Sequence, residues 1–338
     1  MRLRGLRALA WNGGALYVSS GYRLFRLDPG AGVPPAPVGR FDARPWRRAT
    51  GRWRPTARLF RDGFHALATL PDGTLVAAVA GAIVVLRAGG ARFEVTHRVT
   101  RGTRPLALAV TPQGHVFWGE YFSNPHREAV HVYGSRDGGQ HWDIVHTFAA
   151  GVVRHVHGVV YDGFADCLWV LTGDDDRESA IWKVSPDWRR CETVVEGSQQ
   201  ARAVTLQPTP EALYFATDTP AEQNWIYRLD RRGDLQRLAP ISGSCFWSAQ
   251  AGGRVFFSTA VEPSRRNTSP LARLYGGSEA DGWQQLLAWR RDRWPGRLFQ
   301  YPNIVFASGR SDRGLLAATG VAVRDNDEVT SVWRVGAA

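Results

Sequence analysis

Ser135-Arg-Asp-Gly-Gly-Gln-His-Trp142 lies between two short runs of strand-forming residues, Val130-His-Val-Tyr133 and Asp143-Ile-Val-His146. An aspartate here accepts hydrogen bonds from backbone amides of its own turn, and glycines take backbone angles closed to other residues. A tryptophan at the end folds back over the hairpin. The stretch therefore predicts a tight turn between antiparallel strands, with Ser135, Asp137, Gly139 and Trp142 as its structural residues.

A plan of strand, turn and strand recurs along the whole chain. An apolar strand, a turn of Gly, Pro or Asp and a second apolar strand occur seven times, with starts 41 to 58 residues apart, near the ~40–50-residue period of propeller blades. A second hairpin follows each copy. We therefore expect one all-β domain over residues 1–338, a seven-bladed β-propeller of four-stranded antiparallel blades, with a six-bladed ring as the alternative. The expected blades are roughly 6–58, 59–100, 101–150, 151–198, 199–240, 241–299 and 300–338.

Three further features belong to this fold prediction. The seventh unit lacks an obvious fourth strand, and residues Met1 to Gly5 are expected to supply it and close the ring. Two long connections stand out as lids or decoration: Pro34 to Pro55, rich in Pro, Arg and Trp, and the polar segment Glu262 to Pro270. No stretch shows sustained helical periodicity, so no helix is expected.

The composition limits the classes of partner. Lys and Arg number 42 against 31 Asp and Glu, but they are scattered, which favours a positive surface and no nucleic-acid partner. Cysteines 167, 191 and 245 include no Cys-x-x-Cys pair, so neither structural zinc nor a disulfide framework is expected. The absence of a long apolar run predicts no membrane span, and the lack of a secretory signal predicts a cytoplasmic location. We expect a monomer.

Propeller geometry predicts where polar groups meet. The first strand of each blade runs along the central channel, so its start and the end of the second strand lie around one mouth, on the face opposite the turn of residues 135–142. The residues at these positions are Glu120, Asp174, Asp218, Glu262 and Tyr301 as candidate catalytic groups; Arg104, Arg154, Arg202, Tyr121, His155, Trp247 and Asn303 as candidate substrate ligands; and His65 and His157, with His155, as candidate metal ligands.

The chemistry of these residue types suggests their roles. A carboxylate pair serves as acid and base or nucleophile in glycoside cleavage, and arginine binds carboxylate or sulfate through two parallel hydrogen bonds. Histidine binds divalent metals or transfers protons. Each single group also has a structural reading, since acids after strands cap turns and arginines pair with acids on neighbouring blades.

The turn Ser-x-Asp-x-Gly-x-x-Trp of residues 135–142 resembles the Asp box of bacterial sialidase-like, BNR-repeat propellers. The resemblance implies a glycosyl-hydrolase-like architecture, an arginine triad, which Arg104, Arg154 and Arg202 would imitate, and a late tyrosine, which Tyr301 would supply. The early Phe-Arg-Ile-Pro motif of sialidases is absent; the nearest sequence is Leu24-Phe-Arg-Leu27.

Three functions are consistent with these observations. The first is a carbohydrate-active enzyme, hydrolase or lyase, that acts on an anionic glycan at the mouth without a cofactor. The second is a non-catalytic propeller that binds glycan or protein there. The third is a metal-dependent propeller enzyme that uses His65, His155 and His157 to hold a divalent ion.

Overall fold

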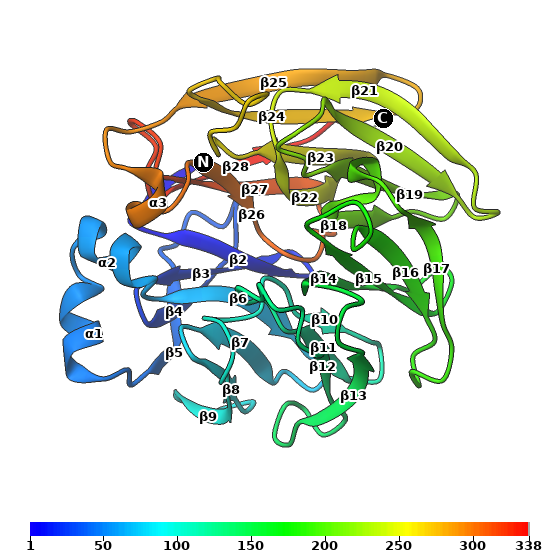
Figure 1. The fold of residues 1–338 in the computed structure, drawn as a ribbon. Coiled ribbons are helices and arrows are strands. Elements are labelled where there is room, and N and C mark those ends of the chain that lie inside the picture. The colour runs from blue at the N-terminus through cyan, green and yellow to red at the C-terminus, as the bar shows by residue number, and fades with distance from the viewer. Residues whose placement is uncertain (337–338) are drawn as a thin grey trace.

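Twenty-eight strands are arranged around a central axis in the computed structural model, which describes residues 1–336 (Figure 1). They form five separate four-stranded sheets and one eight-stranded sheet. The eight-stranded sheet is two blades joined at their outer edges, where β5 and β9 pair in parallel through Arg40 with Arg92 and Phe41 with Phe93. The described chain is thus a seven-bladed all-β ring, as the repeats predicted.

The strands of each blade follow chain order from the axis outward. Blade 1 contains β2 (Arg7–Asn12), β3 (Ala15–Ser20), β4 (Arg23–Leu27) and β5 (Ala36–Phe41); blade 2 contains β6 (Phe64–Thr69), β7 (Leu75–Val79), β8 (Ala82–Leu86) and β9 (Arg92–Arg98); blade 3 contains β10 (Ala109–Val110), β11 (Val116–Gly119), β12 (Val130–Ser135) and β13 (Asp143–Phe148). Blade 4 contains β14 (His155–Asp162), β15 (Cys167–Gly173), β16 (Ala180–Val184) and β17 (Cys191–Glu196); blade 5 contains β18 (Ala203–Pro208), β19 (Ala212–Thr217), β20 (Asn224–Asp230) and β21 (Leu235–Ile241). Blade 6 contains β22 (Cys245–Ala251), β23 (Arg254–Thr259), β24 (Leu271–Ser278) and β25 (Gly282–Arg290); blade 7 contains β26 (Asn303–Phe306), β27 (Leu315–Val321), β28 (Val329–Arg334) and, from the other end of the chain, β1 (Arg2–Arg4).

The N-terminus closes the ring. Strand β1 pairs antiparallel with β28, with Leu3 opposite Thr330, and the amino group of Met1 donates a 2.9 Å hydrogen bond to the carbonyl of Val332. The expected fourth strand of the last blade is therefore confirmed. This pairing joins the two ends of the chain and holds the blades around one channel.

The core lies between the faces of neighbouring blades. Middle strands are covered by neighbouring strands on both sides, and in β7 all five residues are apolar and buried. Outer strands face solvent on one side, and β9 exposes charged residues such as Arg92 and Glu94. The repeated pair of apolar runs in the sequence thus corresponds to the first and second strands of each blade.

Three short helices correct the expectation of no helix. They are α1 (Pro45–Thr50) and α2 (Arg54–Phe60) in the first long connection, and α3 (Gly296–Phe299); a 3-10 turn, η1 (Gln199–Ala201), precedes β18. Prolines in the first turn start α1 and α2. Helices of four to seven residues are too short for an apolar period to be visible in the sequence.

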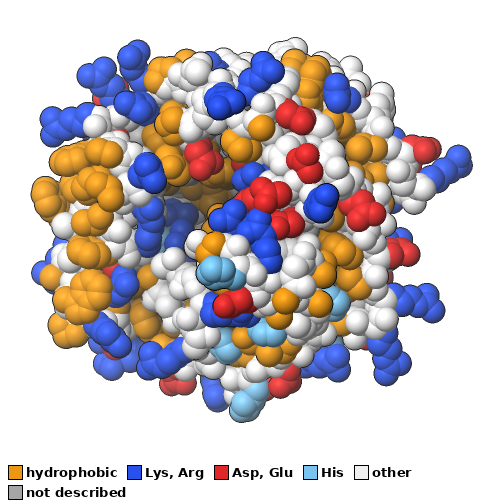
Figure 2. Space-filling view, viewed as in Figure 1, with side chains coloured by type: hydrophobic (Ala, Val, Ile, Leu, Met, Phe, Trp, Pro, Cys, Tyr) orange, Lys and Arg blue, Asp and Glu red, His pale blue; other side chains and the backbone are white. Residues whose placement is uncertain are grey.

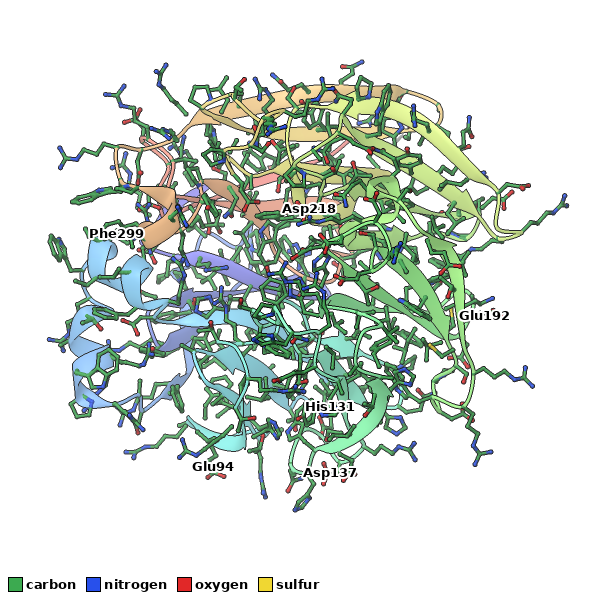
Figure 3. All side chains as sticks on the ribbon, in the orientation of Figure 1. Glu94, His131, Asp137, Glu192, Asp218 and Phe299 are labelled. Atoms are coloured by element: carbon green, nitrogen blue, oxygen red, sulfur yellow. The ribbon has the colours of Figure 1, made fainter. Side chains whose placement is uncertain are left out.

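The turn between β12 and β13 has the contacts that its residues suggested. Asp137 accepts hydrogen bonds from the hydroxyl of Ser135 and the amides of Gln140 and His141, and Trp142 donates to the carbonyl of Gly139. It lies at the periphery in Figure 3, far from Asp218 near the axis.

No helix in residues 1–336 is long and apolar enough to cross a membrane.

Candidate functional site

The starts of the inner strands carry a shared irregularity. In blade 4 the residue between Val156 and Gly158 has no partner on the next strand, and this bulged residue is His157. The same bulge in blade 2 falls on His65. Bulges re-aim side chains next to functional sites, so equivalent positions in two blades direct histidines toward the channel.

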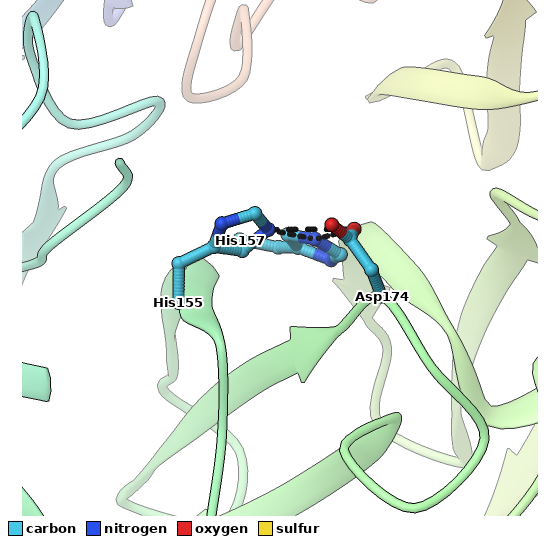
Figure 4. Close-up of side chains that lie close together, drawn as sticks. All are labelled: His155, His157 and Asp174. Atoms are coloured by element: carbon cyan, nitrogen blue, oxygen red, sulfur yellow. Dashed lines mark hydrogen bonds and ion pairs between the residues drawn. The ribbon is translucent and has the colours of Figure 1, made fainter. Parts of the chain in front are cut away.

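Blade 4 brings three of the predicted residues into contact. The Nε2 atoms of His155 and His157 are 3.0 Å apart, and each lies 3.4 Å from Oδ1 of Asp174 (Figure 4). Both histidines are buried, and the Asp174 side chain is 22% exposed, so the cluster opens to solvent through its carboxylate. Burial lowers the pKa of His157.

Arginines link this cluster to blade 5. Arg202 contacts Oδ1 of Asp174 at 3.0 Å and Oδ2 of Asp218 at 3.2 Å, and Arg154 lies 3.3 Å from the other oxygen of Asp174. Burial opposes ionisation of Asp174, but its contacts with both histidines and the charge of Arg202 hold its pKa well below the usual range. Asp218 is more deeply buried, and desolvation raises its pKa to about 7 in spite of Arg202. The two carboxyl groups that contact this one guanidinium therefore have pKa values shifted in opposite directions.

Tyr121 and Glu262 complete this side of the mouth. The Tyr121 ring packs on His155 with centroids 4.4 Å apart, and burial, followed by the charges of Asp174 and Asp218, raises its pKa to about 12. Glu262 is half-buried, and burial together with Asp174 raises its pKa. We call this group the acidic wall; it consists of Tyr121, His155, His157, Asp174, Arg202, Asp218 and Glu262.

The opposite side of the mouth is cationic. Burial and the charges of Arg7 and Arg61 lower the pKa of Arg104 to about 9, and burial together with Arg104 lowers the pKa of His65 well below 6.5. Within residues 1–336, neither Arg7, Arg61 nor Arg104 makes an ion pair with an acid. His65 Nε2 lies 2.6 Å from the carbonyl of Arg61, and its Nδ1 is buried without a partner in that range. We call Arg7, Arg61, His65 and Arg104 the arginine wall.

The surface shows charged side chains on either side of one hollow. In Figure 2 the centre of the face is recessed, with Lys and Arg side chains along one side and Asp and Glu mixed with Arg along the other. Below the mouth a cavity of about 580 Å³ follows the inner strands and is lined mainly by apolar residues. A ligand at the mouth would therefore contact charge at the rim and apolar side chains deeper in the channel.

The remaining predicted residues lie outside the acidic wall. Glu120 is buried in an ion pair with Arg101 and accepts a 2.9 Å hydrogen bond from the amide of His131, so its contacts are structural. Trp247 lines the cavity and packs on Val305. The amide of Asn303 donates to the carbonyl of Tyr301.

His65 does not join the other two histidines. Its neighbours are Arg61, Arg104 and Arg7, whereas His155 and His157 contact each other and Asp174. The expected trio of histidine ligands is therefore replaced by two histidines and an aspartate.

Arg7 and Arg61 are not among the site residues predicted from the sequence. Arg7 stands at the start of β2, in the same register as His155 of β14, and the rule that selected His155 selects Arg7 once the bulge in each strand is aligned. Arg61 follows α2 and takes a left-handed backbone conformation with a φ of 57°. Without the helix, no pattern in the sequence places Arg61 at the mouth.

Comparisons with known proteins show the fold and no family. No protein-family model matches the sequence, and no curated protein matches it. The chain is similar to a chain of the Mitotic Checkpoint Complex, with a TM-score of 0.59 and 12% identity over 99% of this chain and 94% of that one. The chain is also similar to the WD40 beta propeller domain of Doa1, with a TM-score of 0.58 and 9% identity over 98% of this chain and 93% of that one.

A bacterial extracellular domain gives a similar result. The extracellular domain of a hybrid two component system, BT4673 from B. thetaiotaomicron, has a TM-score of 0.60 and 11% identity, over 99% of this chain and 38% of that one. The chain is thus a β-propeller, and its function has to be inferred from its own mouth.

Proposed function

We propose that this propeller is a carbohydrate-active protein that binds an anionic saccharide across the mouth and cleaves it there. The single observation that carries the proposal is the arginine wall, whose three half-buried arginines form no ion pair in the described chain. Unpaired buried charge is costly unless a ligand supplies the counter-charge. A carboxylate or sulfate on the saccharide is the matching group, because guanidinium binds such anions bidentately.

The acidic wall supplies groups for bond cleavage. Asp174 is held ionised, whereas Glu262 and Asp218 have raised pKa values. Carboxyl groups whose environments separate their pKa values are suited to act as base and acid. Of the two carboxyl groups with raised pKa values, Glu262 is the more exposed, so we assign it the role of proton donor to the leaving group.

The saccharide class rests on two supports. The turn at residues 135–142 resembles the Asp box of sialidase-like propellers, and the mouth combines charge at its rim with an apolar channel below it. Sugars present both hydroxyl groups and apolar ring faces to such sites. Tyr301 and Trp247 are assigned to contact the ring, together with Tyr121.

The test is a turnover assay on oligosaccharides of glucuronate, galacturonate and sialate, with the matched neutral oligosaccharides as controls and mass spectrometry of the products. We expect cleavage of an anionic substrate and none of its neutral counterpart. Binding of the anionic forms without any product would instead support a non-catalytic glycan-binding propeller. Neither binding nor turnover with any anionic saccharide would contradict the proposal.

A further inference from the structure

The two buried histidines of blade 4 are fixed in one tautomer by the backbone. Nδ1 of His155 lies 3.0 Å from the carbonyl of Phe122, and Nδ1 of His157 lies 2.9 Å from the carbonyl of Ala203. A carbonyl only accepts, so each Nδ1 carries the hydrogen, and each Nε2 of a neutral ring is left with a lone pair. These two Nε2 atoms face each other at 3.0 Å. Two lone pairs at that distance repel unless a cation lies between them.

A carboxylate oxygen supplies a third donor. Oδ1 of Asp174 is 3.4 Å from both Nε2 atoms, as the dashed lines in Figure 4 mark. The point equidistant from these three atoms lies about 1.9 Å from each, so an ion slightly out of their plane would make bonds of about 2.0–2.1 Å. The three atoms therefore already stand at the separations of ligands to one metal ion.

The surrounding chain leaves room for this arrangement. A Cβ on Gly173, the residue before Asp174, would stand 2.8 Å from Cε1 of His157. Any larger residue at position 173 would push the imidazole out of the triangle. Histidine ligands commonly donate their second nitrogen to a carbonyl, which orients the ring toward the metal, and both rings here do so.

Two arginines compete for the carboxylate. Arg202 contacts the same oxygen of Asp174, and Arg154 contacts the other oxygen. Arg202 has a second acidic partner in Asp218, so it keeps an ion pair when an ion takes the Asp174 oxygen. A shared proton is the other occupant that this triangle accommodates.

We infer that His155, His157 and Asp174 form a binding site for a divalent first-row transition-metal ion. Two imidazoles and one carboxylate suit Zn²⁺, Mn²⁺ or Fe²⁺ and do not suit Ca²⁺ or Mg²⁺, which prefer all-oxygen sites. Three protein ligands leave coordination positions open toward the mouth, where a bound ion would polarise a substrate oxygen. The inference does not depend on saccharide cleavage, because the site consists of protein atoms alone.

The test is calorimetric titration of the full-length, EDTA-treated protein with Zn²⁺ and with Mn²⁺, without saccharide. We expect one equivalent of at least one of these ions to bind, and H157Q to weaken its affinity by about 100-fold or more. His65→Gln is the matched control, because it removes the equivalent buried bulge histidine of blade 2, and it should change the affinity by less than about threefold. Absence of binding to the wild type, or an equal loss in H65Q, would overturn the inference and leave a shared proton in the triangle.

A second measurement guards against a folding defect in H157Q. Asp174→Asn keeps the size of the side chain and removes its charge, and each variant is first checked for cooperative unfolding in EDTA. The metal should raise the Tm of the wild type, since a ligand that binds only the folded state stabilises it, and should shift D174N much less. Equal Tm shifts in both proteins would overturn the inference even if the calorimetric titration showed heat.

Discussion

The two walls of the mouth hold the same kinds of side chain in opposite electrical settings. His157 and His65 occupy the same bulge in blades 4 and 2, yet His157 meets a carboxylate and a second histidine, whereas His65 meets arginines. Arg202 is paired with two acids, whereas Arg104 has none among the described residues. Equivalent positions in different blades therefore place side chains at the mouth. The residues of the neighbouring blade determine the charge that surrounds each of these side chains. The acidic wall contains its own counter-charges, whereas the three arginines of the arginine wall form no ion pair in the described chain.

The largest expected effect is a loss of kcat when Glu262, the assigned proton donor of the acidic wall, is replaced. Glu262→Gln should lower kcat on an anionic saccharide by about 10²–10⁴-fold with a smaller change in KM, because the amide cannot deliver a proton. Steady-state kinetics on the substrate found by the turnover assay measures this. Glu120→Gln is the comparison, since Glu120 pairs with Arg101 away from the wall. Equal losses of kcat in both variants would remove Glu262 from its assigned role.

The next largest effect is expected on affinity for the saccharide when Arg104 of the arginine wall is replaced. Arg104→Met should raise KM, or weaken binding of an anionic saccharide, by about 10–100-fold, since a hydrogen bond to a charged group contributes about 1.5–3 kcal/mol. The same variant should keep or raise the Tm of the ligand-free protein, because it removes an unpaired charge. Arg273→Met serves as the control, because Arg273 is half-buried on β24 without an ion pair in the described chain. A loss of Tm in R104M together with unchanged affinity would show a structural role.

A smaller effect tests the packing that shapes the acidic wall. Gly173→Ala should destabilise the protein by about 1–3 kcal/mol and weaken metal binding, because its Cβ would stand 2.8 Å from the His157 ring. Urea unfolding and metal titration measure the two effects. Gly163→Ala in the same blade meets nothing closer than 3.6 Å and should cost much less. Similar costs in the two variants would mean that the His157 ring moves aside freely.

The last prediction concerns the pH dependence of stability, which involves no loss of activity or of ligand binding. The pKa of Asp218 is raised from 3.8 to about 7 on folding, so between these values the folded state binds more protons than the unfolded state. Its contribution to stability is therefore present at low pH and is lost as pH rises from about 4 to 7, by about 1–4 kcal/mol in total. Asp218→Asn should flatten the pH dependence of the unfolding free energy in that range. An unchanged slope in D218N would show that Asp218 is ionised throughout.

The sequence was sufficient to predict the ring of blades and some of the residues of the acidic wall. Apolar runs at a propeller period predicted seven blades and the closing strand at Met1, because buried middle strands must be apolar on both faces. The rule for strand ends also brought Asp174, His155 and Arg202 to one place. The same rule did not distinguish Glu120 from the other acids. Glu120 forms an ion pair with Arg101, which lies at a position that the rule does not consider.

The arginine wall shows why the rest was beyond the sequence. Arg61 reaches the mouth from the end of α2, a seven-residue helix without a visible period. In the part of the chain that the structure describes, Arg104 forms no ion pair because none of the side chains around it in the folded structure is an acid within contact distance. The residues next to Arg104 in the sequence do not indicate this. Charge balance, which carries the functional proposal, becomes visible only when the blades are assembled.

The most direct measurement compares the affinity of the wild-type protein for an acidic oligosaccharide and for the same oligosaccharide with its carboxyl groups reduced to alcohols. Isothermal calorimetry at about 0.1 M salt suits this, because surface charges farther apart than about 10 Å are then screened. The account predicts that the acidic form binds at least about tenfold more tightly and that R104M removes the difference. Equal affinities for the two forms across the uronate and sialate panel would contradict an anion-binding mouth.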